Sequence, residues 1–77
     1  MNSHPTQIRA EMVANVIAIS VSVGEVIATG DVLLLLESMK MEIPVLSEIP
    51  GTVVEIAVAP GDVIQEGDLL IRLEAKV

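Results

Sequence analysis

Apolar residues alternate with polar or small residues along two separate segments of the chain. In residues 17–23, every second side chain is a large aliphatic one, and those between are alanine or serine. Residues 54–58 show the same alternation, with Glu55 and Ala57 between the aliphatic residues. A period of two is typical of a half-buried strand, so one face of each segment is expected to point inward. The residues on these inward faces are Ile17, Ile19, Val21 and Val23 in the first segment, and Val54, Ile56 and Val58 in the second.

The second half of the chain is a copy of the first at an offset of 37 residues. Residues 24–33 read GEVIATGDVL, and residues 61–70 read GDVIQEGDLL. Units of this size are too small to bury a core alone, so the two halves must share one. No segment as long as an ordinary helix has apolar residues at helical spacing. The repeat therefore predicts an all-β fold of two similar antiparallel sheets, packed face to face with pseudo-two-fold symmetry.

The repeat also predicts the remaining strands and one irregularity. Val16 and Val53 lie out of phase with the alternating segments, and a bulge near Asn15 and Thr52 would turn both valines inward. Further strands are expected at 33–37, 69–74 and 41–46. The strand equivalent to 41–46 in the other half of the repeat is expected at 8–12. We expect residues 1–7 to form a flexible N-terminal tail and residues 8–76 to form the domain.

Prolines and acidic residues indicate how the strands are connected. Proline cannot donate to a strand ladder, so Pro44 favours an edge position. Asp31 and Asp68 recur as a pair, which could suggest two catalytic carboxylates. The repeat assigns them to equivalent turns instead, where side-chain hydrogen bonds to the backbone explain them better.

Composition excludes several classes of function. The chain has 77 residues, enough for one small domain, and it lacks Phe, Tyr, Trp and Cys. Its net charge of −7 repels phosphate backbones, and no aromatic ring is available for stacking on a base, so nucleic-acid binding is not expected. The N-terminus does not read as a secretory signal, and no apolar run is long enough to span a membrane. We expect a soluble, cytoplasmic protein that is monomeric in isolation.

Lys40 stands at the midpoint of the repeat. Its equivalents are Ser3 and Val77 at the chain ends, so Lys40 should project from the opposite end of the molecule. An exposed lysine amine is protonated at neutral pH. Lys40 is therefore a poor nucleophile by itself and is better suited to be modified by another enzyme.

The sequence around this lysine resembles the attachment site of biotinyl domains. Residues 37–42 read ESMKME, where that family usually has Ala-Met-Lys-Met. Glycines also fall at the family's turns, and the resemblance extends over residues 11–74, as in the small stand-alone biotinylated proteins of actinobacteria. The resembling glycines are Gly24, Gly30, Gly51, Gly61 and Gly67.

The resemblance implies a flattened barrel of two four-stranded sheets with Lys40 on an exposed hairpin turn. It implies that a biotin protein ligase joins biotin to Lys40. The biotin would then carry carboxyl groups from a biotin carboxylase to a carboxyltransferase, as in the acyl-CoA carboxylases of fatty acid biosynthesis. The chain itself would be a carrier and not an enzyme.

The residues flanking Lys40 are candidates for recognition by the ligase. In the resembling family the ligase recognises the methionines on both sides of the lysine, which correspond to Met39 and Met41 here. Glu42 has no acidic partner in the repeat and is a further candidate, whereas Glu37 corresponds to Glu74, which also allows a structural role. Ser38 replaces the usual alanine and is interpreted as a small residue that fits a tight turn.

Two other functions remain open. A lipoyl carrier would share the fold, but lipoyl domains more often have Asp-Lys-Ala at this turn. An unmodified interaction module would have no use for Lys40. Only Ala28 and Thr29 separate Ile27 from Gly30, so the thumb-like insertion of some acetyl-CoA carboxylase carriers is not expected.

Overall fold

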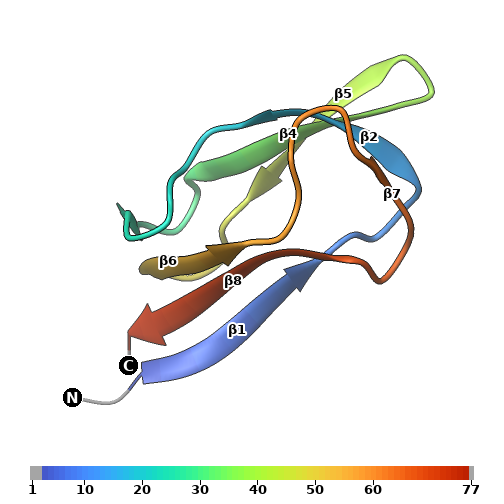
Figure 1. Cartoon of the computed structure of the whole chain (residues 1–77). Helices are drawn as coiled ribbons and strands as arrows, with labels where there is room; N and C mark the ends of the chain where they lie inside the picture. The colour runs from blue at the N-terminus through green and yellow to red at the C-terminus, as the bar shows by residue number, and fades with distance from the viewer. Residues whose placement is uncertain (1–2, 77) are drawn as a thin grey trace.

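The computed structural model describes residues 3–76 as eight antiparallel strands in two sheets (Figure 1). One sheet has the order β1-β8-β6-β3 and the other β5-β4-β2-β7. Residues 3–76 contain no helix, and so none that could cross a membrane. The predicted all-β fold of two four-stranded antiparallel sheets is confirmed. The strands are β1 (Ser3–Arg9), β2 (Ala14–Ile19), β3 (Val26–Ile27), β4 (Val32–Ser38), β5 (Met41–Leu46), β6 (Gly51–Ile56), β7 (Val63–Ile64) and β8 (Leu69–Lys76).

The pseudo-two-fold symmetry extends to single hydrogen bonds. An offset of 37 residues carries β1 to β4 onto β5 to β8, and each sheet takes two strands from each half. Gly24 N–H donates to the Val53 carbonyl over 2.7 Å, and Gly61 N–H donates to the Val16 carbonyl over 2.8 Å. Neither half could form its sheet alone, which explains why the two copies share one core.

Aliphatic side chains fill most of this core, and Ser47 is a buried polar residue whose hydroxyl donates to the Ile49 carbonyl over 2.6 Å. The fully buried apolar residues are Leu33, Leu34, Val53, Leu70, Ile71 and Leu73. Adjacent residues in a regular strand face opposite sides, yet Leu33 and Leu34 are both buried. The β4–β5 register shifts between Val32 and Leu34, so a bulge turns both leucines inward.

The strands β2 and β6 also contain bulges, which correct part of the predicted pattern. The register shifts between Val16 and Ala18 in β2, and at the equivalent position in β6. Val16 and Val53 are buried, as the predicted bulges require, but the extra residues are Ile17 and Val54. The prediction that Ile17 and Val23 face inward was wrong, because they are 37% and 63% exposed.

The N-terminal strand begins earlier than predicted. We expected a strand at 8–12, but β1 covers Ser3–Arg9 and pairs with β8. The offset of 37 residues carries 41–46 onto 4–9, so β1 follows the repeat better than the predicted range did. Residues 3–7, which we expected to form a tail, belong to this strand, while residues 1–2 lie outside the described part of the chain.

The turns follow the prediction closely. Oδ2 of Asp31 accepts a hydrogen bond from Ala28 N–H over 2.8 Å, and Oδ2 of Asp68 accepts one from Gln65 N–H over 2.8 Å. These aspartates are therefore turn residues. Pro44 lies in β5, an edge strand, where its missing donor leaves no ladder bond unmade. The link from β3 to β4 is a tight turn with no thumb-like insertion.

Gly51 is required where β6 meets β8. A Cβ atom at this position would lie 2.6 Å from the Glu74 carbonyl oxygen, which belongs to the backbone and cannot rotate away. Overpacking of this kind costs about 1–3 kcal/mol. We expect Gly51→Ala to lower the thermal unfolding midpoint by at least about 5 °C, as followed by circular dichroism. Ser22→Ala, at an exposed site, should change it by less than about 4 °C, and equal shifts would contradict the steric explanation.

Candidate functional site

The hairpin between β4 and β5 turns through two residues, Met39 and Lys40. Ser38 pairs with Met41 to close the turn, and the φ angles of Met39 and Lys40 are 52° and 66°. Two successive positive φ angles are typical of a type I′ turn, in which Asn-Gly is the usual sequence. A left-handed conformation costs a residue with a side chain about 1–2 kcal/mol. The turn thus keeps two residues that its backbone disfavours, which indicates a function for their side chains.

This turn lies at one tip of an elongated molecule. The described chain measures 42 × 19 × 17 Å along its principal axes. Figure 1 shows the β4–β5 turn at the opposite end from the start of β1 and the end of β8. The position that the repeat predicted for Lys40 is confirmed, although Val77, one of its two equivalents, lies outside the described residues.

The side chains of the turn face solvent. Met39 is 91% exposed and Met41 is 64% exposed, so neither contributes to the core. Lys40 is exposed and forms no hydrogen bond or ion pair with any described residue. Its amine is therefore open to a reagent or an enzyme.

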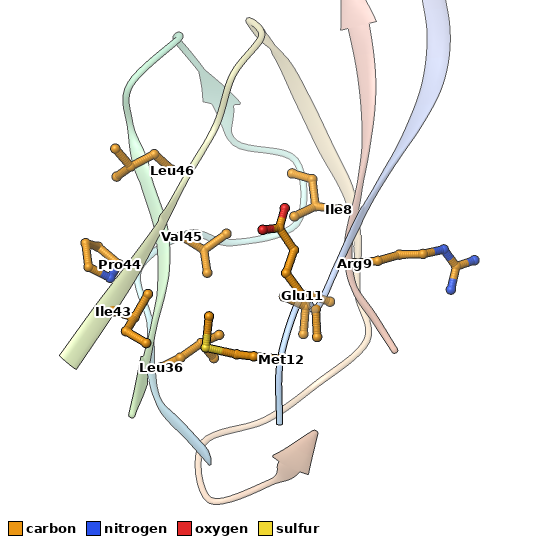
Figure 2. Close-up of a pocket in the computed structure, with 11 residues that line it drawn as sticks. Ile8, Arg9, Glu11, Met12, Leu36, Ile43, Pro44, Val45 and Leu46 are labelled. Atoms are coloured by element: carbon orange, nitrogen blue, oxygen red, sulfur yellow. The ribbon is translucent and has the colours of Figure 1, made fainter. Parts of the chain in front are cut away.

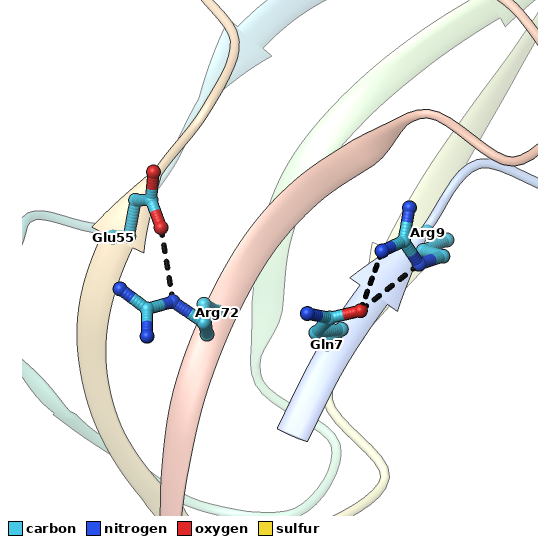
Figure 3. Close-up of polar contacts among 4 residues, drawn as sticks. All are labelled: Gln7, Arg9, Glu55 and Arg72. Carbon is cyan, nitrogen blue, oxygen red and sulfur yellow. Dashed lines mark hydrogen bonds and ion pairs between the residues drawn. The ribbon is translucent and has the colours of Figure 1, made fainter. Parts of the chain in front are cut away.

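Unlike Lys40, both arginines have hydrogen-bond or ion-pair partners for their side chains (Figure 3). Arg72 Nε lies 2.9 Å from Oε1 of Glu55 in a half-exposed ion pair on β8 and β6. Arg9 donates to the Gly67 carbonyl over 2.8 Å and also to the side chain of Gln7. Both guanidinium groups are held on the sheet that does not contain the Lys40 turn.

Two acidic residues lie at the base of the turn. Glu37 on β4 stands directly opposite Glu42 on β5, and both are exposed. Like charges directly opposite one another destabilise a strand pair. Neither carboxylate has a partner among the described residues, so nothing in the fold compensates for this repulsion. The pair is therefore better explained by contact with another molecule than by stability.

Ser38 anchors the turn to the segment between β1 and β2. Its Oγ donates a hydrogen bond to the Val13 carbonyl over 3.2 Å. The repeat equivalent of Ser38 is Ala75, which has no hydroxyl, so this bond occurs only at the Lys40 end. The sequence interpretation treated Ser38 as a small turn residue and missed this anchoring role.

A shallow depression lies beside the turn, and we call it the Lys40 depression. The residues that line it are Val13, Ala14, Asn15, Glu37, Ser38, Met39, Lys40 and Val63. Strand pairing brings Asn15 and Val63 there, since Asn15 pairs with both Glu37 and Val63. No motif around Lys40 includes Val13, Asn15 or Val63, and only the pairing of β2 with β4 and β7 could have indicated them.

A second hollow is mostly apolar and lies between edge strands β1 and β5 (Figure 2). Ile8 and Val45, equivalent residues in the repeat, point into it, and Arg9 points away. It contains neither Lys40 nor a residue of its turn. Among residues 6–75, whose side chains the structure describes, no group of acidic or histidine side chains could hold a metal ion.

Comparison with known protein families identifies the family to which the chain belongs. The family model described as "Biotin-requiring enzyme", for biotin and lipoyl attachment, matches residues 6–73. The chain belongs to this family. The family description and the biotinylated relatives indicate covalently bound biotin, and an exposed amine without a partner is compatible with such an attachment.

The curated relatives of this biotin/lipoyl domain are biotinylated proteins. The chain is 61% identical over 44 residues to the biotinylated protein TB7.3 homolog of Mycobacterium leprae, and the match covers 57% of this chain and 62% of that protein. It is 60% identical over 40 residues to biotinylated protein TB7.3 of Mycobacterium tuberculosis, covering 52% of this chain and 56% of that protein. The match thus spans only about three fifths of each relative.

Solved structures show the same fold within larger enzymes and in a lipoyl domain. A single-chain, multi-domain long-chain acyl-CoA carboxylase matches with a TM-score of 0.88 and 26% identity, covering 94% of this chain and 7% of that one. Kluyveromyces lactis urea carboxylase matches with a TM-score of 0.84 and 25% identity, covering 95% and 6%. The lipoyl domain of the Azotobacter vinelandii 2-oxoglutarate dehydrogenase complex matches with a TM-score of 0.77 and 26% identity, covering 87% and 92%.

Proposed function

We propose that this biotin/lipoyl domain is a biotin carboxyl carrier and that Lys40 is its attachment site. The observation that carries the proposal is an exposed lysine without a partner, on a strained two-residue turn and flanked by two exposed methionines. A biotin protein ligase would transfer the biotinyl group from biotinyl-AMP to Nζ of Lys40. An amide bond forms, AMP leaves, and the amine loses a proton.

The domain's own contribution is to hold and present the cofactor. The lysine side chain and the biotin valeryl chain together form an arm of roughly 12–15 Å. An arm on a narrow tip can enter a deep active site while the sheets stay outside it. Tethering also raises the effective concentration of biotin at each active site. The domain needs no catalytic group of its own for this task.

The partners would be the two halves of a biotin-dependent carboxylase. A biotin carboxylase would carboxylate the biotin ureido nitrogen, and a carboxyltransferase would pass the carboxyl group to an acyl-CoA. The acyl-CoA carboxylase and urea carboxylase among the structural matches support a partner of this kind. The acyl-CoA carboxylase match supports an acyl-CoA as the acceptor.

A lipoyl carrier is the second candidate, because a lipoyl domain shares the fold. The methionines on both sides of Lys40 favour biotin, since lipoyl domains more often have Asp-Lys-Ala at this turn. The biotinylated relatives favour it as well.

Intact mass spectrometry of the protein from its own host separates these candidates. We expect a species heavier than the unmodified chain by one biotinyl group, and fragmentation should assign that group to Lys40. A lipoyl mass would establish the second candidate instead. An unmodified chain from biotin-replete cells that also resists biotinylation by the host's ligase would refute the biotin proposal.

A further inference from the structure

Exposed valines extend the surface around Lys40 beyond its own hairpin. Val13 is 57% exposed and Val63 is 63% exposed, and both line the Lys40 depression together with Met39. These residues come from three separate segments: the link between β1 and β2, strand β7, and the turn itself. Large aliphatic side chains in water favour contact with another apolar surface.

The valine of β7 is part of a continuous row across the sheet. Val63 pairs with Asn15, Asn15 pairs with Glu37, and Glu37 pairs with Glu42, so the row passes through β7, β2, β4 and β5. All four side chains are exposed. The row joins the acidic pair at the base of the turn to an apolar end at Val63.

The repeat contains a second exposed valine that lies away from the Lys40 turn. The equivalent of Val63 is Val26, which is 68% exposed on an equally short strand, β3. Val26 pairs with Thr52 in the other sheet and does not line the Lys40 depression. The two valines therefore match in residue type, exposure and local structure, and only Val63 lines the Lys40 depression.

We propose that Val13 and Val63, with Met39, form a second contact surface for the biotin protein ligase that modifies Lys40. This inference rests on the proposed function. An enzyme that acylates Nζ of Lys40 must cover the tip of the molecule, and Lys40 itself is one of the residues that line the Lys40 depression. The depression is apolar at Val13, Val63 and Met39 and acidic at Glu37. The matching ligase surface therefore has apolar side chains bordered by a basic one.

The test compares Val63→Glu with Val26→Glu. Each variant adds one carboxylate at an exposed position of a two-residue strand. Purified apo protein is given the host's biotin protein ligase, biotin and ATP, and incorporation is followed by intact mass. We expect Val63→Glu to lower kcat/KM at least about 10-fold, mainly through KM, and Val26→Glu to change it less than about 2-fold. Val13→Glu should behave like Val63→Glu.

Val63→Thr keeps the branched shape and adds no charge, so it separates lost apolar contact from added repulsion. We expect it to lower kcat/KM about 3-fold with an unchanged thermal midpoint, and it serves as the test if Val63→Glu does not fold. Equal effects of the Val63 and Val26 substitutions would overturn the second contact surface. Failure of the unaltered protein to accept biotin would instead refute the proposed function, so the two failures are distinguishable.

Discussion

Lys40→Arg is expected to abolish biotin incorporation while the protein stays folded. Arginine keeps the positive charge but has no primary amine to form the amide. Lys40 is exposed and forms no contact with a described partner, so the change in unfolding free energy should stay within about 0.5 kcal/mol. Streptavidin blotting of cells producing each variant measures incorporation, and circular dichroism measures folding.

Lys76→Arg is the matched control, since the chain has only these two lysines. It should be biotinylated as efficiently as the unaltered protein. Streptavidin labelling that persisted in Lys40→Arg would contradict the assignment of the attachment site. Labelling lost only with Lys76→Arg would move the site to the far end of β8.

The topology could be predicted from the sequence because the chain is a repeat. Each half supplies two strands to each sheet, so one sheet arrangement determines the other. The same symmetry predicted that Lys40 lies at the end opposite the termini. It also distinguished turn aspartates from catalytic ones, and Asp31 and Asp68 bond to the backbone as expected.

Details of packing were harder to predict, because bulges change the phase of a strand. Residues on the two sides of a bulge do not follow one alternation, and the position of the extra residue depends on the partner strand. Ile17 therefore faces outward although the pattern placed it inside. The buried neighbours Leu33 and Leu34 have the same origin.

One part of the candidate site could be predicted from the sequence, and another part could not. The motif around Lys40 is local, so the sequence contains it in full. The Lys40 depression is not local, since Val13 and Val63 reach it only through the pairing of β2 with β4 and β7. The positive φ angles of Met39 and Lys40 could not be predicted from the sequence either, because these residue types do not favour a type I′ turn.

Replacing both Met39 and Met41 with glutamine is expected to lower kcat/KM for biotinylation at least about 10-fold. Full burial of one methionine side chain against a partner is worth about 1.5–3 kcal/mol, and 1.4 kcal/mol corresponds to a factor of ten. Met39 and Met41 are 91% and 64% exposed and neither belongs to the core, so most of this energy is not used in folding. The thermal midpoint should therefore shift by less than about 4 °C.

Leu46→Gln provides the control on the same strand. Leu46 is 47% exposed at the far end of β5, roughly 17 Å from Met41, so its loss should leave biotinylation unchanged. A large fall in thermal stability of the double methionine variant would show that the methionines support the fold. Unchanged kinetics would show that the ligase does not read them. Selective loss of kcat/KM is the result that explains why a turn suited to Asn-Gly retains Met-Lys.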